Sequence, residues 1–95
     1  MQLKEAYLDR VAREVEDLAS RVAILKARFA RQKVNVKLEH YWELESLRTR
    51  FAEFKRRVVD LEDAEDAQLP KTREGVELAW KDLINAVETL TAALH

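Results

Sequence analysis

The 95-residue sequence has no cysteine, one glycine and one proline. Without cysteine, disulfides, thiolate metal sites and thiol nucleophiles are excluded. Glycine and proline mark turns, so their scarcity, together with 47% apolar and 37% charged residues, favours long helices over a sheet. We therefore predict one all-α domain over residues 1–95, which needs a well-packed helical core or a partner chain for stability.

Long apolar runs are also missing, since the longest charge-free apolar run is the segment VAIL at residues 22–25. A helix that spans a bilayer needs about 20 mostly apolar residues, so none is expected. Asp9 and Arg10 interrupt the region where a signal peptide would carry its apolar segment. The sequence thus predicts a cytoplasmic protein.

The charges nearly balance, with a net charge of −1, but they are unevenly distributed. Residues 18–38 carry six bases and no acid, whereas residues 59–69 carry five acids and no base. Blocks of opposite sign indicate pairing within or between chains. The basic block precedes Tyr41 and Trp42, and a basic segment beside aromatic rings can bind single-stranded nucleic acid. Weak nucleic-acid binding is therefore an alternative, although the net charge argues against it.

Apolar residues recur at alternating spacings of three and four in three runs, which is the pattern of a coiled-coil seam. The runs are Leu8, Val11, Val15, Leu18, Val22 and Leu25; Leu44, Leu47, Phe51, Phe54, Val58 and Leu61; and Val76, Trp80, Leu83, Val87, Leu90 and Leu94. Folded antiparallel, the runs match in six layers of three residues, one from each run, for example Val11, Val58 and Trp80. We therefore predict a coiled-coil-like core of antiparallel three-helix layers.

Two arrangements satisfy this register, because the first two runs pair about a midpoint between Val34 and Asn35. A turn at the midpoint gives a monomeric three-helix bundle. Alternatively, one continuous helix over about residues 3–67 pairs antiparallel with a second copy, and a C-terminal helix over about residues 70–94 folds back. Pro70 suits the first turn of that last helix, but Asn35 is the only turn-prone residue near the midpoint. The weak turn signal favours the continuous helix and an antiparallel homodimer.

Three segments carry a family resemblance: KEAYLDRV at residues 4–11, KLEHYWELESLR at 37–48 and GVELAWKDLINAV at 75–87. They resemble a family of small uncharacterised bacterial coiled-coil proteins, some of which are described as stress-response proteins. The resemblance covers nearly the whole chain. It implies a long helix followed by a shorter amphipathic one, and no known catalytic residue. The chain departs from the family pattern at Pro70 and at residues 34–36, where the family leads us to expect a tryptophan-containing acidic stretch and an alanine-rich helix.

The segment around the midpoint contains the candidate interaction residues. They are Phe29, Arg31, Lys33, Lys37, His40, Tyr41 and Trp42. In a hairpin, the tip would present the three aromatic residues among them beside bases, whereas in a continuous helix they would lie mostly in the seam. His40 could share a helix face with Glu39 and Glu43, but the Glu-x-x-His motif of helical di-metal sites is missing. We therefore expect His40 to be a polar seam residue opposite Phe29, and we predict no metal site.

Catalytic motifs are also missing. There is no glycine-rich loop, and Ser20 and Ser46 are the only serines, so no nucleophile–base pair or phosphate cradle is indicated. Residues 70–94 have a wide apolar face like that of lipid-binding helices, although completing the bundle explains the same residues. We predict a non-enzymatic coiled-coil structural or protein-interaction protein without a cofactor. A membrane-surface or stress-associated amphipathic protein is the first alternative.

Overall fold

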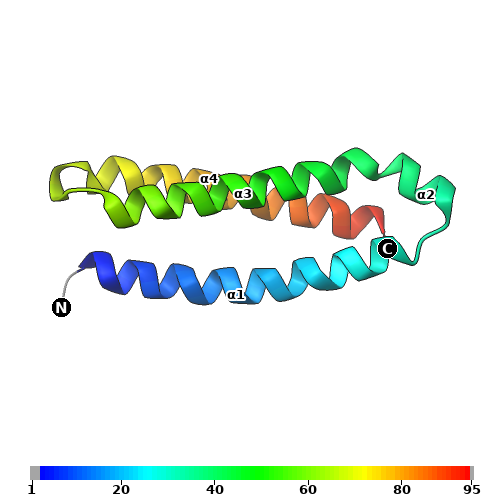
Figure 1. Cartoon of the computed structure of the whole chain (residues 1–95), viewed down its shortest axis with the longest axis horizontal. Helices are drawn as coiled ribbons and strands as arrows, with labels where there is room; N and C mark the ends of the chain where they lie inside the picture. The colour runs from blue at the N-terminus through cyan, green and yellow to red at the C-terminus, as the bar shows by residue number, and fades with distance from the viewer. Residues whose placement is uncertain (1–2, 95) are drawn as a thin grey trace.

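The computed structural model describes residues 3–94, which form an all-α rod of 50 × 19 × 17 Å. Its elements are α1 (Leu3–Ala30), α2 (Val34–Glu39), α3 (Tyr41–Asp63), the 3₁₀ helix η1 (Asp66–Gln68) and α4 (Leu69–Ala93). Helix α3 runs antiparallel to both α1 and α4 (Figure 1). Helices α3 and α4 lie closest together, and α1 packs along the pair at wider spacing. The predicted all-α, antiparallel three-helix architecture is confirmed.

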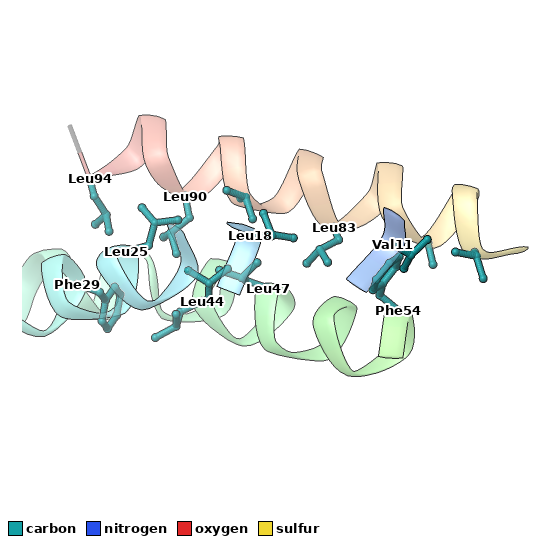
Figure 2. Close-up of a cluster of buried hydrophobic side chains, with 14 of the residues drawn as sticks. Val11, Leu18, Leu25, Phe29, Leu44, Leu47, Phe54, Leu83, Leu90 and Leu94 are labelled. Atoms are coloured by element: carbon teal, nitrogen blue, oxygen red, sulfur yellow. The ribbon is translucent and has the colours of Figure 1, made fainter. Parts of the chain in front are cut away.

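The predicted layers form the core. Every residue of the three apolar runs belongs to it, and most are buried. The exceptions are partly buried and pack against the core; they are Leu8, Val15, Phe51, Val58 and Trp80. In Figure 2, Leu83 of α4, Leu47 of α3 and Leu18 of α1 are drawn among the buried side chains of this cluster. The three-four spacing therefore identified the buried face of each long helix.

Three further residues are buried that the runs did not include, namely Tyr7, Phe29 and Ala79. At the start of α1, Tyr7 is buried and Leu8 only partly so. A straight α-helix has 3.6 residues per turn and drifts relative to a 3.5-residue repeat, so a neighbouring position turns inward near a helix end. Phe29 follows Leu25 by four residues and extends the same apolar stripe into the last turn of α1.

The prediction of one continuous helix over residues 3–67 is wrong. Helix α1 ends at Ala30, and the chain turns through residues 31–33 before α2 begins. Arg31 N–H donates to the Arg28 carbonyl (3.3 Å), and Gln32 N–H donates to the Phe29 carbonyl (3.1 Å), so the helix ends in tightened turns. Lys33 is then extended, with φ −64° and ψ 155°. Any residue can adopt these angles, and none within residues 3–94 has positive φ, so the turn needs no glycine.

From Val34 to Asp63 the backbone is nearly one helix with a bend at His40. His40 N–H donates to the Val36 carbonyl (3.1 Å) as the last helical bond of α2, and Leu44 N–H donates to the His40 carbonyl (3.3 Å) as the first of α3, so the two helices meet at His40, whose φ of −109° and ψ of 14° bend the chain. The second turn joins α3 to α4 through residues 64–68, and Pro70 lies in the first turn of α4 as predicted. The fold is thus the hairpin alternative, with α2 at the tip between α1 and α3 (Figure 1).

Candidate interaction surface

Large apolar side chains are exposed mainly at the hairpin tip. Within residues 3–94 the exposed ones are Ile24 (57% exposed), Val34 (71%), Leu38 (71%), Tyr41 (46%), Trp42 (77%), Val59 (51%) and Leu78 (56%). Four of these seven fall between residues 34 and 42. We call Val34, Leu38, Tyr41 and Trp42 the tip surface. Single exposed apolar residues are ordinary, but a cluster of this kind marks a contact site.

The local sequence explains why these side chains face solvent. In α2, Val36 packs against the core, and residues two positions apart in a helix point to nearly opposite faces. Val34 and Leu38 therefore lie together on the outer face, four residues apart. Trp42 follows Leu38 by four residues, beyond the bend at His40, and is also exposed. The Tyr41 and Trp42 rings meet edge to face, with centroids 5.1 Å apart.

The predicted interaction residues divide into two groups. Tyr41 and Trp42 are exposed and belong to the tip surface, as a hairpin requires. Phe29 is buried in the core at 9% exposure, so the expectation that a hairpin would display it is wrong. Phe29 extends the apolar stripe of α1 by one helical turn, and this extension is buried in the core.

The predicted bases surround the tip surface. Arg31 and Lys33 are exposed in the connection between α1 and α2, and Lys37 is half-buried in the last turn of α2. None of the three forms an ion pair within residues 3–94, where the ion pairs involve other residues. The tip therefore combines apolar side chains with cations that no internal carboxylate neutralises.

His40 is half-buried at the bend, and its Nδ1 lies 2.8 Å from Glu43 Oε2. This contact joins neighbouring turns of the same helical segment, as the spacing of three residues predicts. No group of three His, Cys, Asp or Glu side chains within residues 3–94 is placed to hold a metal ion. His40 and Glu43 thus form a local hydrogen bond that supports the bend.

Sequence reasoning missed Val34 and Leu38. Val34 marked only the midpoint of the register, and Leu38 lay outside the three apolar runs. A signal was present, because Val34, Leu38 and Trp42 recur every four residues out of phase with Phe29 and Val36. A second apolar stripe on the opposite face of a core helix indicates a surface that the core does not use.

The apolar face of α4 is not available in this fold. Its residues Val76, Leu83, Val87 and Leu90 are among the most deeply buried in the chain, and Leu78 is the exposed large apolar side chain of α4. The face that resembled a lipid-binding helix therefore completes the bundle. No helix within residues 3–94 has the length and apolar character to cross a membrane.

A groove of about 880 Å³ between α3 and α4 carries charges of both signs. Within it, Glu53 accepts hydrogen bonds from Arg56 (2.7 and 3.1 Å) and Arg57 (3.0 Å). The Arg56 hydrogen bond is the main cause that holds the pKa of Glu53 below its usual range. Glu53 and Arg57 thus pair within the lining of the groove, while Arg50 and Lys71, which also line it, form no ion pair within residues 3–94.

Protein-family models, curated proteins and solved structures were all compared with the chain, and none matches. The resemblance of the three segments to bacterial coiled-coil proteins therefore stays a prediction.

Proposed function

We propose that the protein is a non-enzymatic helical interaction protein that contacts a partner through the tip surface. The observation that carries this proposal is the concentration of exposed apolar side chains between residues 34 and 42. The rest of the rod buries its apolar stripes in its own core. The motif resemblance supports a stress-associated setting for this contact.

The charge of the tip argues that the partner is anionic. Arg31, Lys33 and Lys37 lie next to the tip surface and form no ion pair with the described part of the chain, residues 3–94. Two tips packed against each other would bring these cations together, and like charges oppose such a contact. A partner of negative charge would gain both the apolar contact and the electrostatic attraction.

Exchange of α1 between two copies remains our proposal for a homodimer. If residues 31–33 became helical, the same core layers would form between chains, because the register about the midpoint is the same. Val34 and Leu38 would still lie off the seam, since their helical phase differs from that of Phe29 and Val36. The exchange therefore leaves Val34 and Leu38 off the seam, and a contact through these two residues does not depend on it.

The test compares how the tagged full chain sediments in total lysates that retain membranes. The tip variant Val34→Ser/Leu38→Ser removes two tip side chains, and Ile24→Ser/Leu78→Ser removes two exposed apolar side chains elsewhere on the rod. We expect the wild type and the second variant to sediment together in a larger assembly and the tip variant to sediment as the free chain. Identical sedimentation of all three would contradict the proposal.

A further inference from the structure

Three of the four tip-surface residues project outward. The main grooves within residues 3–94 run between helices along the rod, and Val34, Leu38 and Tyr41 line none of them, whereas Trp42 lines a groove of about 290 Å³ between α3 and α4. In Figure 1, α2 lies at the end of the rod, beyond the C-terminal end of α4. A protein partner would need a pocket that matches this projecting stripe. A bilayer interface accepts projecting apolar groups without a preformed pocket.

The side-chain types also suit the interface of a bilayer. Tryptophan and tyrosine favour the headgroup level, where a ring can contact apolar chains and a polar group can stay hydrated. Trp42 is the most exposed large apolar residue of the described chain, and Val34 and Leu38 precede it on the outer face of α2. Val34 and Leu38 are about 6 Å apart at the helical rise, so both can enter the interfacial layer together.

The charges near the tip determine whether it would bind an anionic or a cationic bilayer. Residues 28–42 carry the four bases Arg28, Arg31, Lys33 and Lys37 against the single acid Glu39. The acidic block of residues 59–69 lies around the turn at the other end of a rod 50 Å long. Electrostatic interactions in physiological salt fade over about 8 Å, so a membrane at the tip meets the local cations and not the net charge of −1.

We infer that the tip surface docks on an anionic lipid bilayer, with Val34, Leu38 and Trp42 in the interfacial layer and the neighbouring bases against lipid phosphates. This inference rests on the proposed function and names the partner of the same surface. It differs from membrane binding through α4, because α4 keeps its apolar face in the core. The membrane contact would then lie at the tip, and the acidic block would lie at the opposite end of the rod.

The test is flotation of the purified full chain with vesicles of phosphatidylcholine mixed with phosphatidylglycerol, and with vesicles of phosphatidylcholine alone. We expect binding to the anionic vesicles to be at least about tenfold stronger, because each basic residue near the surface adds to the attraction. Val34→Ser/Leu38→Ser should reduce binding to the anionic vesicles about tenfold, and Ile24→Ser/Leu78→Ser should leave it unchanged. Far-UV circular dichroism checks that both variants keep the helical content of the wild type.

The fluorescence emission of Trp42 reports how deeply the tip surface inserts into the bilayer. In the variant Trp80→Phe, Trp42 is the only tryptophan, and its emission should shift to shorter wavelength on addition of anionic vesicles. An unshifted emission, a chain that stays in the lipid-free fraction, or equal losses in both serine variants would overturn the inference. Tip-dependent assembly in the lysate without vesicle binding would retain the proposed function and indicate a protein or nucleic-acid partner instead. If neither tip-dependent assembly in the lysate nor vesicle binding is observed, both proposals are contradicted.

Discussion

At the end of the rod where α3 turns into α4, side chains of α1 and α4 meet that turn in polar contacts. Lys4 Nζ donates to the carbonyls of Glu62 (2.7 Å) and Ala64 (3.0 Å), which satisfies oxygens that the end of α3 leaves without helical partners. The Tyr7 ring lies between two guanidinium groups, with Arg73 4.4 Å and Arg10 5.0 Å from its centroid. We call this the closed end.

The tip is built differently. Lys33 occupies the N-cap position of α2, and its side chain makes no capping hydrogen bond. The polar contact of the bend, between His40 and Glu43, is local to one helical segment. Val36 alone of the α2 residues packs against the core, while Val34 and Leu38 face solvent. Few contacts hold the tip, so changes there cost little stability and leave its surface free for a partner.

The largest expected difference between the two ends comes from the same substitution made at each. Leu61 is 2% exposed near the closed end, and Leu61→Ala should lower the free energy of unfolding by about 2–5 kcal/mol through lost burial and a cavity. Leu38 is 71% exposed, and Leu38→Ala should change it by less than about 0.5 kcal/mol. Urea unfolding followed by circular dichroism measures both. Similar losses would show that the tip is packed in solution, and the contrast between the ends would fail.

A smaller effect is expected from removing the lysine that joins α1 to the second turn. Lys4→Met keeps the aliphatic stem but loses both hydrogen bonds to carbonyl oxygens, and should cost about 1 kcal/mol because the site is only half-buried. The matched change Lys33→Met at the tip removes a charge that makes no ion pair among the described residues, and should leave the unfolding free energy nearly unchanged. Equal costs would mean that the closed end owes nothing to Lys4.

A gain of stability is expected from capping α2. Lys33 already has the extended backbone of an N-cap residue, so Lys33→Asp would supply a carboxylate for the free N–H groups of the first turn. We expect the unfolding free energy to rise by about 0.5–1 kcal/mol. In a continuous helix the same aspartate would lie in the helix interior and would destabilise it. Light scattering then measures the mass of the wild type and of the variant. The mass of one chain would identify the hairpin, and twice that mass would support the exchanged dimer.

The sequence predicted the core well because the three-four spacing is local and fixes which face of each helix is buried. Leu47 and Leu83 belong to matched runs and are fully buried. The break at residues 31–33 was harder to predict, because pairing within one chain and pairing between two chains bury the same side chains. The difference lies in the connection, and its extended Lys33 leaves no signature in residue type.

The candidate site was predicted only in part, again because the residue types do not reveal the connection at residues 31–33. Once the chain turns, Tyr41 and Trp42 must lie at the tip beside Lys33, as the hairpin alternative stated. Phe29 was misplaced because the end of α1 extends the core by one more turn. Leu38 became recognisable only when Val36 was seen to pack inward, which assigns the opposite face of α2 to solvent.

The smallest expected effect concerns the stability contribution of Tyr7 at the closed end, and it becomes visible only at high pH. Burial, with a further contribution from Glu77, raises the pKa of Tyr7 above its ordinary value of 10.0. The folded state thus holds this proton more tightly than the unfolded chain does. The resulting stability is complete below about pH 10 and is lost as the pH rises through the folded-state pKa. Tyr7→Phe keeps the ring between the two guanidinium groups and removes the proton.

At neutral pH we expect Tyr7→Phe to change the unfolding free energy by less than about 0.5 kcal/mol. Above pH 10 it should lose less stability than the wild type. Comparing the variant with the wild type isolates Tyr7, because the two proteins share every other titratable group. Parallel losses in both proteins would show that Tyr7 ionises without cost in the fold, and the closed end would then lack the buried, guanidinium-flanked tyrosine that sets it apart from the tip.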